Sequence, residues 1–255
     1  MPIDRARADL QATLSLHGLK LRGSFAPTAD DKLPSLPDGQ PIANVWMVGV
    51  IGSTFWPHFK ASSFFNDGLS DPLDRWSRAI GEELAARLGG LALFPFTGPP
   101  YHPFQRWADR AEATQPSRML LRIHPQHGLW HAYRFALALP ALEHLGARQP
   151  GHSGTAAEDA AMQALTPSHG DAAGERSPDI CASCSGQPCL RACPVGAYTG
   201  AAFLLDACAG HLHSGQGADC MQSGCLARRA CPVGSRFMYT EEHAAFHMQA
   251  FAQNH

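Results

Sequence analysis

The sequence predicts a mixed α/β or α+β domain followed by a separate cysteine module. Helical and strand periodicities alternate through residues 1–145, large apolar residues become scarce over 146–179, and all eight cysteines lie beyond residue 180. With 255 residues and 45% hydrophobic content, the chain is long enough for two modest units. We therefore expect a first domain at 1–145, a linker at 146–179, a cysteine module at 180–240 and a C-terminal helix or tail at 241–255.

Hydrophobic spacing predicts most elements of the first domain. A helix is expected to begin after Ser70 or Asp71 with Pro72 at its first position, and Gly89-Gly90 ends it. Its apolar residues recur every three or four positions: Leu73, Trp76, Ile80, Leu84 and Leu88. Further helices are expected at Asp4–Leu16 and Trp107–Ala113, and strands at Pro41–Ser53, Leu91–Phe96, Met119–Ile123 and Trp130–Leu139. The last strand alternates, with an apolar face formed by Tyr133, Phe135, Leu137 and Leu139 opposite Arg134, Ala136 and Ala138.

Composition excludes several classes of function. Lys+Arg is 20 and Asp+Glu is 22, which gives a net charge of −2 and no basic excess for a nucleic-acid partner. The longest apolar run, Val45–Ile51, is too short to span a membrane. The N-terminus lacks the apolar core of a signal peptide, so we expect a cytoplasmic protein. No phosphate-binding loop, dinucleotide fingerprint or nucleophile elbow is present in the sequence.

The cysteines follow a pattern typical of iron–sulfur proteins. The run Cys181-x2-Cys184-x4-Cys189-x3-Cys193-Pro194 is close to the bacterial ferredoxin run, in which the fourth cysteine ligates a second cluster. The later cysteines, Cys208, Cys220, Cys225 and Cys231, also end in Cys-Pro-Val-Gly. We therefore predict two 4Fe–4S clusters with crossed ligation. Cluster one takes Cys181, Cys184, Cys189 and Cys231, and cluster two takes Cys193, Cys208, Cys220 and Cys225.

Two alternatives compete with this assignment. Zinc sites favour paired C-x2-C knuckles and have no use for two Cys-Pro ends. Disulfides fit a short secreted chain rather than a cysteine-free domain with a compact cassette in a reducing compartment. One departure concerns the spacing between the second and third ligands, where Ser185–Pro188 provides four residues instead of two. The longer spacing affects which ligand positions Cys184 and Cys189 take more than it affects the expected number of clusters.

A second motif lies in the cysteine-free domain. Ile123-His124-Pro125-Gln126-His127-Gly128-Leu129-Trp130-His131-Ala132-Tyr133-Arg134 resembles the I-H-P-x-x-G-x-W-x-A-x-R segment of CblC-type cobalamin-processing proteins. There this segment forms a strand–turn–strand, and an apolar strand ending in Leu-Pro follows, as Leu139-Pro140 does here. Leu69-Ser70-Asp71-Pro72-Leu73-Asp74 is similar to that family's L-T-D-P-V-D helix start. The resemblance covers roughly residues 40–140.

The resemblance implies a fold related to the flavin-dependent nitroreductases and a cavity for cobalamin with its lower base detached. The cysteine module looks like the ferredoxin-like dicluster domain of epoxyqueuosine reductases and reductive dehalogenases, which pair such a domain with a CblC-like one. By this resemblance His124, Pro125, Gly128 and Trp130 line the corrin cavity, and Arg134 binds the carboxylates of a thiol cosubstrate or orders the site. From the residues alone, the role of a turn histidine suits His124 as well as a place in the cavity does. Trp130 is expected to be a core residue, and Arg134 is expected to have an anionic partner.

The main functional hypothesis is an iron–sulfur oxidoreductase. Two clusters would relay electrons from a soluble low-potential donor, a ferredoxin or flavodoxin, to a corrinoid, for removal of its upper ligand or reduction of a small organic substrate. The alternatives are a ferredoxin-type electron carrier and a cobalamin-binding or trafficking protein without turnover. The sequence singles out no catalytic acid or base. Arg228-Arg229 are expected to dock an acidic partner or to offset the charge of the second cluster.

Overall fold

The computed structural model describes residues 2–141 and 179–255. The first domain is built on a four-stranded sheet with the order β1-β2-β6-β3. Its strands are β1 (Lys20–Phe25), β2 (Asn44–Ile51), β6 (His131–Leu139) and β3 (Leu91–Leu93). Every neighbouring pair is antiparallel, so the domain is of the α+β kind.

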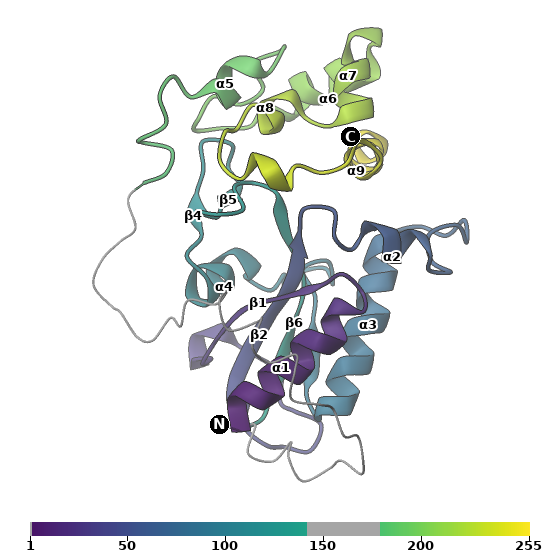
Figure 1. Cartoon of the computed structure of the whole chain (residues 1–255), viewed down its shortest axis with the longest axis vertical. Coiled ribbons are helices and arrows are strands. Elements are labelled where there is room, and N and C mark those ends of the chain that lie inside the picture. Colours follow the sequence, from purple (N-terminus) through teal and green to yellow (C-terminus); the bar gives the residue numbers. More distant parts are fainter. Residues whose placement is uncertain (1, 142–178) are drawn as a thin grey trace, which may run out of the picture.

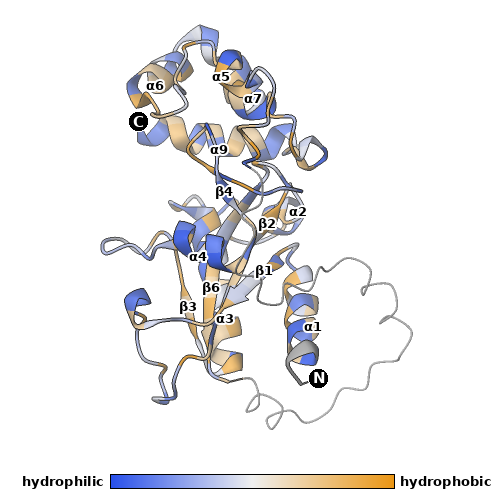
Figure 2. Ribbon diagram, turned by 90° about the vertical axis from the view of Figure 1, so that its left-hand side faces the viewer, coloured by the Kyte–Doolittle hydropathy of each residue, from blue (hydrophilic) through white to orange (hydrophobic). Residues whose placement is uncertain are grey.

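Helices cover both faces of this sheet. Residues of α1 (Pro2–Ser15) and α3 (Pro72–Leu88) share one core with Trp46, Val48 and Val50 of β2. On the other face, α4 (Phe104–Ala111) packs with Val45 and Met47. Figure 2 shows α4 as largely hydrophilic and β3 as apolar. Because both sides of β2 are buried, its sequence is a continuous apolar run rather than an alternating one.

The expected start and end of α3 are confirmed. Asp71 adopts a left-handed conformation with φ of 51°, and Pro72 begins the helix. Gly89 ends it at φ 65°, where its N–H is bonded to the carbonyls of Ala85 and Ala86. A glycine meets that conformation without the Cβ strain that other residues suffer.

The alternation expected in β6 is wrong at one position. The register between β2 and β6 shifts so that Val48 faces Phe135 while Gly49 faces Tyr133, which leaves Arg134 in a bulge. As a result Arg134 and Phe135 both lie on the α3 side, where Arg134 contacts Ser77. Tyr133 packs on the opposite face instead of beside Phe135.

Several expected boundaries also differ. The sequence analysis did not anticipate β1, and β3 ends at Leu93 instead of Phe96. Only Arg122–Ile123 of the expected strand at 119–123 is extended, as β5, and it pairs with the short β4 (Gln115–Pro116). A further short helix, α2 (Trp56–Lys60), follows β2.

The cysteine module is helical and lies at one end of the sheet (Figure 1). It contains α5 (Pro188–Ala192), α6 (Leu205–His213), α7 (Ala218–Ser223) and α8 (Leu226–Arg229). The last helix, α9 (Glu241–Asn254), fills almost all of the expected segment 241–255 and lies between the module and α2. There the buried His243 stacks on Trp56 at 5.0 Å, and the Trp56 indole N–H donates to Glu242 at 3.0 Å.

Two expectations fall outside these elements. All of the linker expected at 146–179 except Asp179, and the short helix expected at Thr155–Leu165, lie outside the described residues. Within 179–255 the chain forms helices, turns and one isolated bridge between Tyr198 and Phe203. None of the described helices has the length and apolar character that crossing a membrane requires.

Candidate functional site

The first group of thiols combines three early cysteines with a late one. Burial raises the pKa of the Cys231 thiol, and the charges of Cys189, Cys181 and Cys184 raise it further. Burial also raises the pKa of Cys189, and Cys181 and Cys184 add to the effect. Thiolates influence one another in this way only when they are close neighbours. These mutual charge effects group Cys181, Cys184, Cys189 and Cys231 as one quartet.

The other four thiols form a second quartet. Burial raises the pKa of Cys208 to about 11, with further contributions from Cys225, Cys193 and Cys220. Cys225 is affected first by burial and then by Cys220 and Cys193. The membership of both quartets is the one that crossed ligation of two clusters requires. All eight cysteines are free thiols, so no disulfide joins them in the structure.

The surroundings of the quartets fit iron–sulfur clusters. Met119, Ile123 and Leu129 pack against cysteines of both quartets in one apolar group. Backbone N–H groups point at the sulfurs: Ala227 and Arg228 donate to Cys225, Val233 donates to Cys231, and Ala197 donates to Cys193 at 3.3 Å. Such bonds stabilise thiolates and raise the reduction potential of a bound cluster.

The zinc alternative would require side chains that hold a single metal ion. Among the described residues, no three His, Cys, Asp or Glu side chains lie close enough together to hold one metal ion. In a cubane each thiolate binds a different iron, so its four ligands stand further apart than those of zinc. The chemistry of the donor set, eight free thiols and two Cys-Pro ends, fits thiolate-ligated clusters.

The His124–Gly128 turn of the first domain lies directly against the Cys231 loop. His124 and Gly128 exchange backbone hydrogen bonds of 2.9 and 2.8 Å, which closes a tight turn. Gly128 has a φ of +59°, and a Cβ added there would lie 1.8 Å from the Val233 carbonyl oxygen. A Cβ on Gly234 would lie 2.3 Å from the His127 carbonyl carbon. Two glycines thus allow the two backbones to touch.

His124 is the turn histidine that the residues alone suggested. Its Nδ1 accepts the backbone N–H groups of Gln126 and His127 at 3.1 and 3.3 Å. The His127 ring stacks on it at 4.3 Å and meets Phe237 of the module edge-on at 4.9 Å. Burial lowers the pKa of both histidines to about 4, so both are neutral near pH 7.

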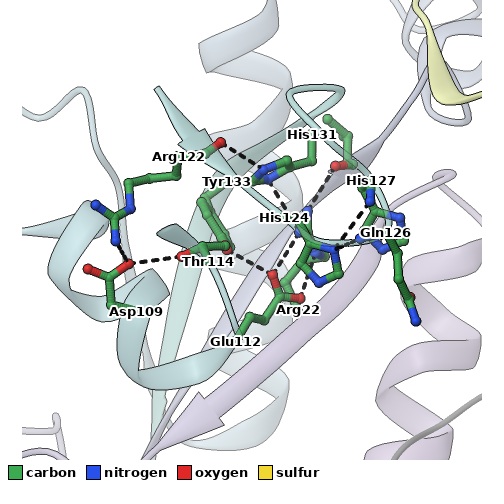
Figure 3. Close-up of polar contacts among 11 residues, drawn as sticks. Arg22, Asp109, Glu112, Thr114, Arg122, His124, Gln126, His127, His131 and Tyr133 are labelled. Carbon is green, nitrogen blue, oxygen red and sulfur yellow. Dashed lines mark hydrogen bonds and ion pairs between the residues drawn. The ribbon is translucent and has the colours of Figure 1, made fainter. Parts of the chain in front are cut away.

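Beneath this turn lies a buried polar network that the sequence analysis did not identify (Figure 3). Arg22, 1% exposed, binds Glu112 through Nε and Nη2 at 2.8 and 2.7 Å. Tyr133 donates its hydroxyl to the same carboxylate at 2.8 Å. His131 Nδ1 accepts from Arg22 at 3.3 Å, so its Nε2 carries the proton and donates to the Arg122 carbonyl at 3.1 Å. The network fixes the start of β6 directly below the turn.

The two segments that carry the CblC-type resemblance meet in space. Arg134 of the first motif forms an ion pair with Asp74 of the second, and its Nε donates to Ser77 at 3.0 Å. The anionic partner expected for Arg134 is therefore a residue of the chain itself. Trp130 is 2% exposed and packs against Tyr239 of the module, as a core residue does.

The residues assigned to a corrin cavity do not enclose one in this structure. Pro125 is exposed at the tip of the turn, while Gly128 and Trp130 are covered by the module. Two open pockets, of about 460 and 380 Å³, lie elsewhere and are lined by other residues. The pockets described here therefore give these five residues no support as a corrin site.

Comparison with known proteins gives this geometry no family: no family model, curated protein or solved structure matches the chain. The resemblance to CblC-type and dicluster proteins therefore stays a prediction.

Acid should destabilise the protein, because several histidines are buried in their neutral form. Burial lowers the pKa of His124, His127 and His247 to about 4, and that of His131 and His243 to about 2. The unfolded chain binds these protons below its own value of 6.5, so stability is full above that pH and falls as the pH drops toward 4. Each histidine contributes up to about 1.4 kcal/mol per pH unit.

The urea midpoint measured at pH 7.5 and at pH 5 checks this expectation. His131→Gln is the matched variant, since it removes one titrating ring and should reduce the pH dependence by about one proton. Equal midpoints at the two pH values for the unmodified protein would contradict the buried neutral state of these rings.

Proposed function

We propose that this chain is an iron–sulfur oxidoreductase that relays electrons through two 4Fe–4S clusters. One observation carries the proposal: the eight free thiols divide into two quartets, and each quartet mixes cysteines from both halves of the cassette. Bound clusters supply single-electron transfer, and the protein supplies placement, shielding from water and tuning of their potentials.

The two Cys-Pro-Val-Gly segments differ in their surroundings. Gly234, after Cys231, presses on the first domain, whereas a Cβ on Gly196 would meet nothing within 4 Å. Val195 and Leu204, which flank the second quartet, are 39% and 47% exposed. Val195 and Leu204 therefore form an exposed apolar edge beside the second quartet, where a soluble low-potential ferredoxin or flavodoxin is the proposed donor. The Cys231 loop then hands electrons toward the first domain. A donor of this kind makes the cytoplasm the proposed compartment.

The metal content of anaerobically purified protein tests the proposal. We expect about eight irons and eight sulfides per chain, with little zinc. Treatment with a chelator after oxidation should remove the iron and leave eight titratable thiols. Stoichiometric zinc, or sulfurs already paired as disulfides, would overturn the assignment.

The corrinoid function stays a second candidate. The observation that favours it is the Asp74–Arg134 ion pair, which joins the two segments that resemble CblC-type proteins. Addition of cobalamin to the cluster-loaded protein should then give the spectrum of the base-off form. Absence of any shift would exclude both the corrinoid reductase and the trafficking protein and leave the electron carrier. Binding without reduction by the reduced clusters would favour trafficking.

A further inference from the structure

Arg228, which is half-buried, differs from Arg22 and Arg134 in lacking an acid partner. Arg22 is paired with Glu112, and Arg134 with Asp74. Arg228 has no carboxylate partner among the described residues. Its Nε is buried and makes no hydrogen bond. A half-buried cation held in place with no carboxylate beside it is suited to act as countercharge to an anionic group that the protein binds.

The side chain of Arg228 is nevertheless held firmly at the interface. Its Nη2 donates to the Leu129 carbonyl oxygen. The guanidinium lies 4.7 Å from the centre of the Trp130 ring and 4.4 Å from that of Tyr239. Because its stacking partners come from both units, the charge is fixed between the first domain and the module. This position is unsuited to docking an acidic partner protein.

In the sequence, Arg228 lies between Cys225 of the second quartet and Cys231 of the first. Helix α8 begins directly after Cys225, and the backbone N–H of Arg228 donates to that sulfur. At the other end of α8, the N–H of Cys231 donates to the Arg228 carbonyl oxygen at 3.2 Å. One residue is thus bonded through its backbone to a ligand of each proposed cluster.

The neighbouring groups do not neutralise this charge. His243 and His247 face Arg228, and burial followed by nearby positive charges lowers the pKa of both rings, so they are neutral. Arg134, on the first domain, is a second cation facing the same two rings and already has its own carboxylate. The acid next to α8, Asp219, is bound by Arg229 at 2.7 Å.

We propose that Arg228 is the internal countercharge of the two clusters and sets their reduction potential. The inference rests on the proposed function. Four thiolates make each bound cluster anionic, and reduction adds one more negative charge. A fixed positive charge nearby stabilises the reduced form over the oxidised form, and its low-dielectric surroundings strengthen the effect. Removing the charge should therefore lower the potential.

Redox titration of Arg228→Gln, with Arg229→Gln as the matched control, tests this role. Arg229 is the next residue of the same helix, but its charge is already paired with Asp219. At a fixed ambient potential, we expect R228Q to lower the ratio of reduced to oxidised cluster about tenfold, or about 59 mV for a one-electron couple. R229Q should change the ratio less than about twofold.

A third variant separates charge from packing. Arg228→Lys keeps the charge but loses the planar stack, so its potential should stay close to that of the unmodified protein. If R228Q loses its iron, R228K decides alone: an unchanged potential supports the proposal, and a tenfold displacement overturns it. Equal potentials in R228Q and R229Q, with iron intact, also overturn it. Absence of iron from the unmodified protein would instead refute the proposed function.

Discussion

The double variant Cys181→Ala/Cys231→Ala is expected to keep one intact cluster, with about four irons per chain. In the crossed arrangement both residues belong to the same quartet, so removing both destroys one site and spares the other. If each half of the cassette held its own cluster, the same two changes would damage both sites and all iron would be lost. The iron count and the electron paramagnetic resonance of the reduced protein measure the outcome.

The reciprocal variant makes the experiment decisive. Cys181→Ala/Cys193→Ala removes two cysteines that are near in sequence but fall in different quartets. Crossed ligation predicts loss of both clusters here, whereas ligation within each half predicts that one survives. The two double variants remove the same number of thiols, so a general loss of stability cannot imitate the contrast. Four irons in the second variant and none in the first would refute crossed ligation.

Sequence spacing alone predicts the two quartets, because ligand spacing is a local property with a strict chemical cause. A cubane needs several thiolates on one tight loop, and the Cys-Pro ends mark the residues that cross to the other cluster. The helix at Pro72–Leu88 was equally predictable, since its proline start, apolar stripe and glycine end all lie within the helix or next to it.

The polar network around Arg22 could not be predicted, because its members are distant in sequence. Arg22, Glu112 and His131 belong to three separate elements, and nothing in their local patterns distinguishes them from surface residues. The bulge at Arg134 escaped prediction for a related reason. It depends on the register between β2 and β6 rather than on the sequence of β6, and one inserted residue moves Tyr133 to the other face.

The His-Pro turn was located correctly as strand–turn–strand, but its surroundings differ from the expectation. Sequence alone shows that His124 and Gly128 are suited to a tight turn. It does not show which surface the turn touches. In the structure that surface is the Val233–Gly234 backbone of the module, so the requirement for glycine at 128 is explained by contact with a protein backbone.

Gly234→Ala is expected to destabilise the contact between the first domain and the module far more than Gly196→Ala. The two glycines occupy equivalent places in the two Cys-Pro-Val-Gly segments, with φ of +70° and +59°. Alanine at positive φ costs about 1–2 kcal/mol at either position. At Gly234 the new Cβ would also overlap the His127 backbone, which should add about 1–3 kcal/mol. Urea unfolding of the cluster-loaded proteins measures the difference.

The same pair of variants tests the direction of the relay. If the Cys231 loop passes electrons to the first domain, G234A should slow electron transfer across this contact to an acceptor while the clusters still accept electrons from the donor. G196A changes a glycine that faces open space, so it should leave this step unchanged and affect donor docking at most. Equal losses of stability in the two variants would show that the interlock seen at Gly234 does not hold the two units together.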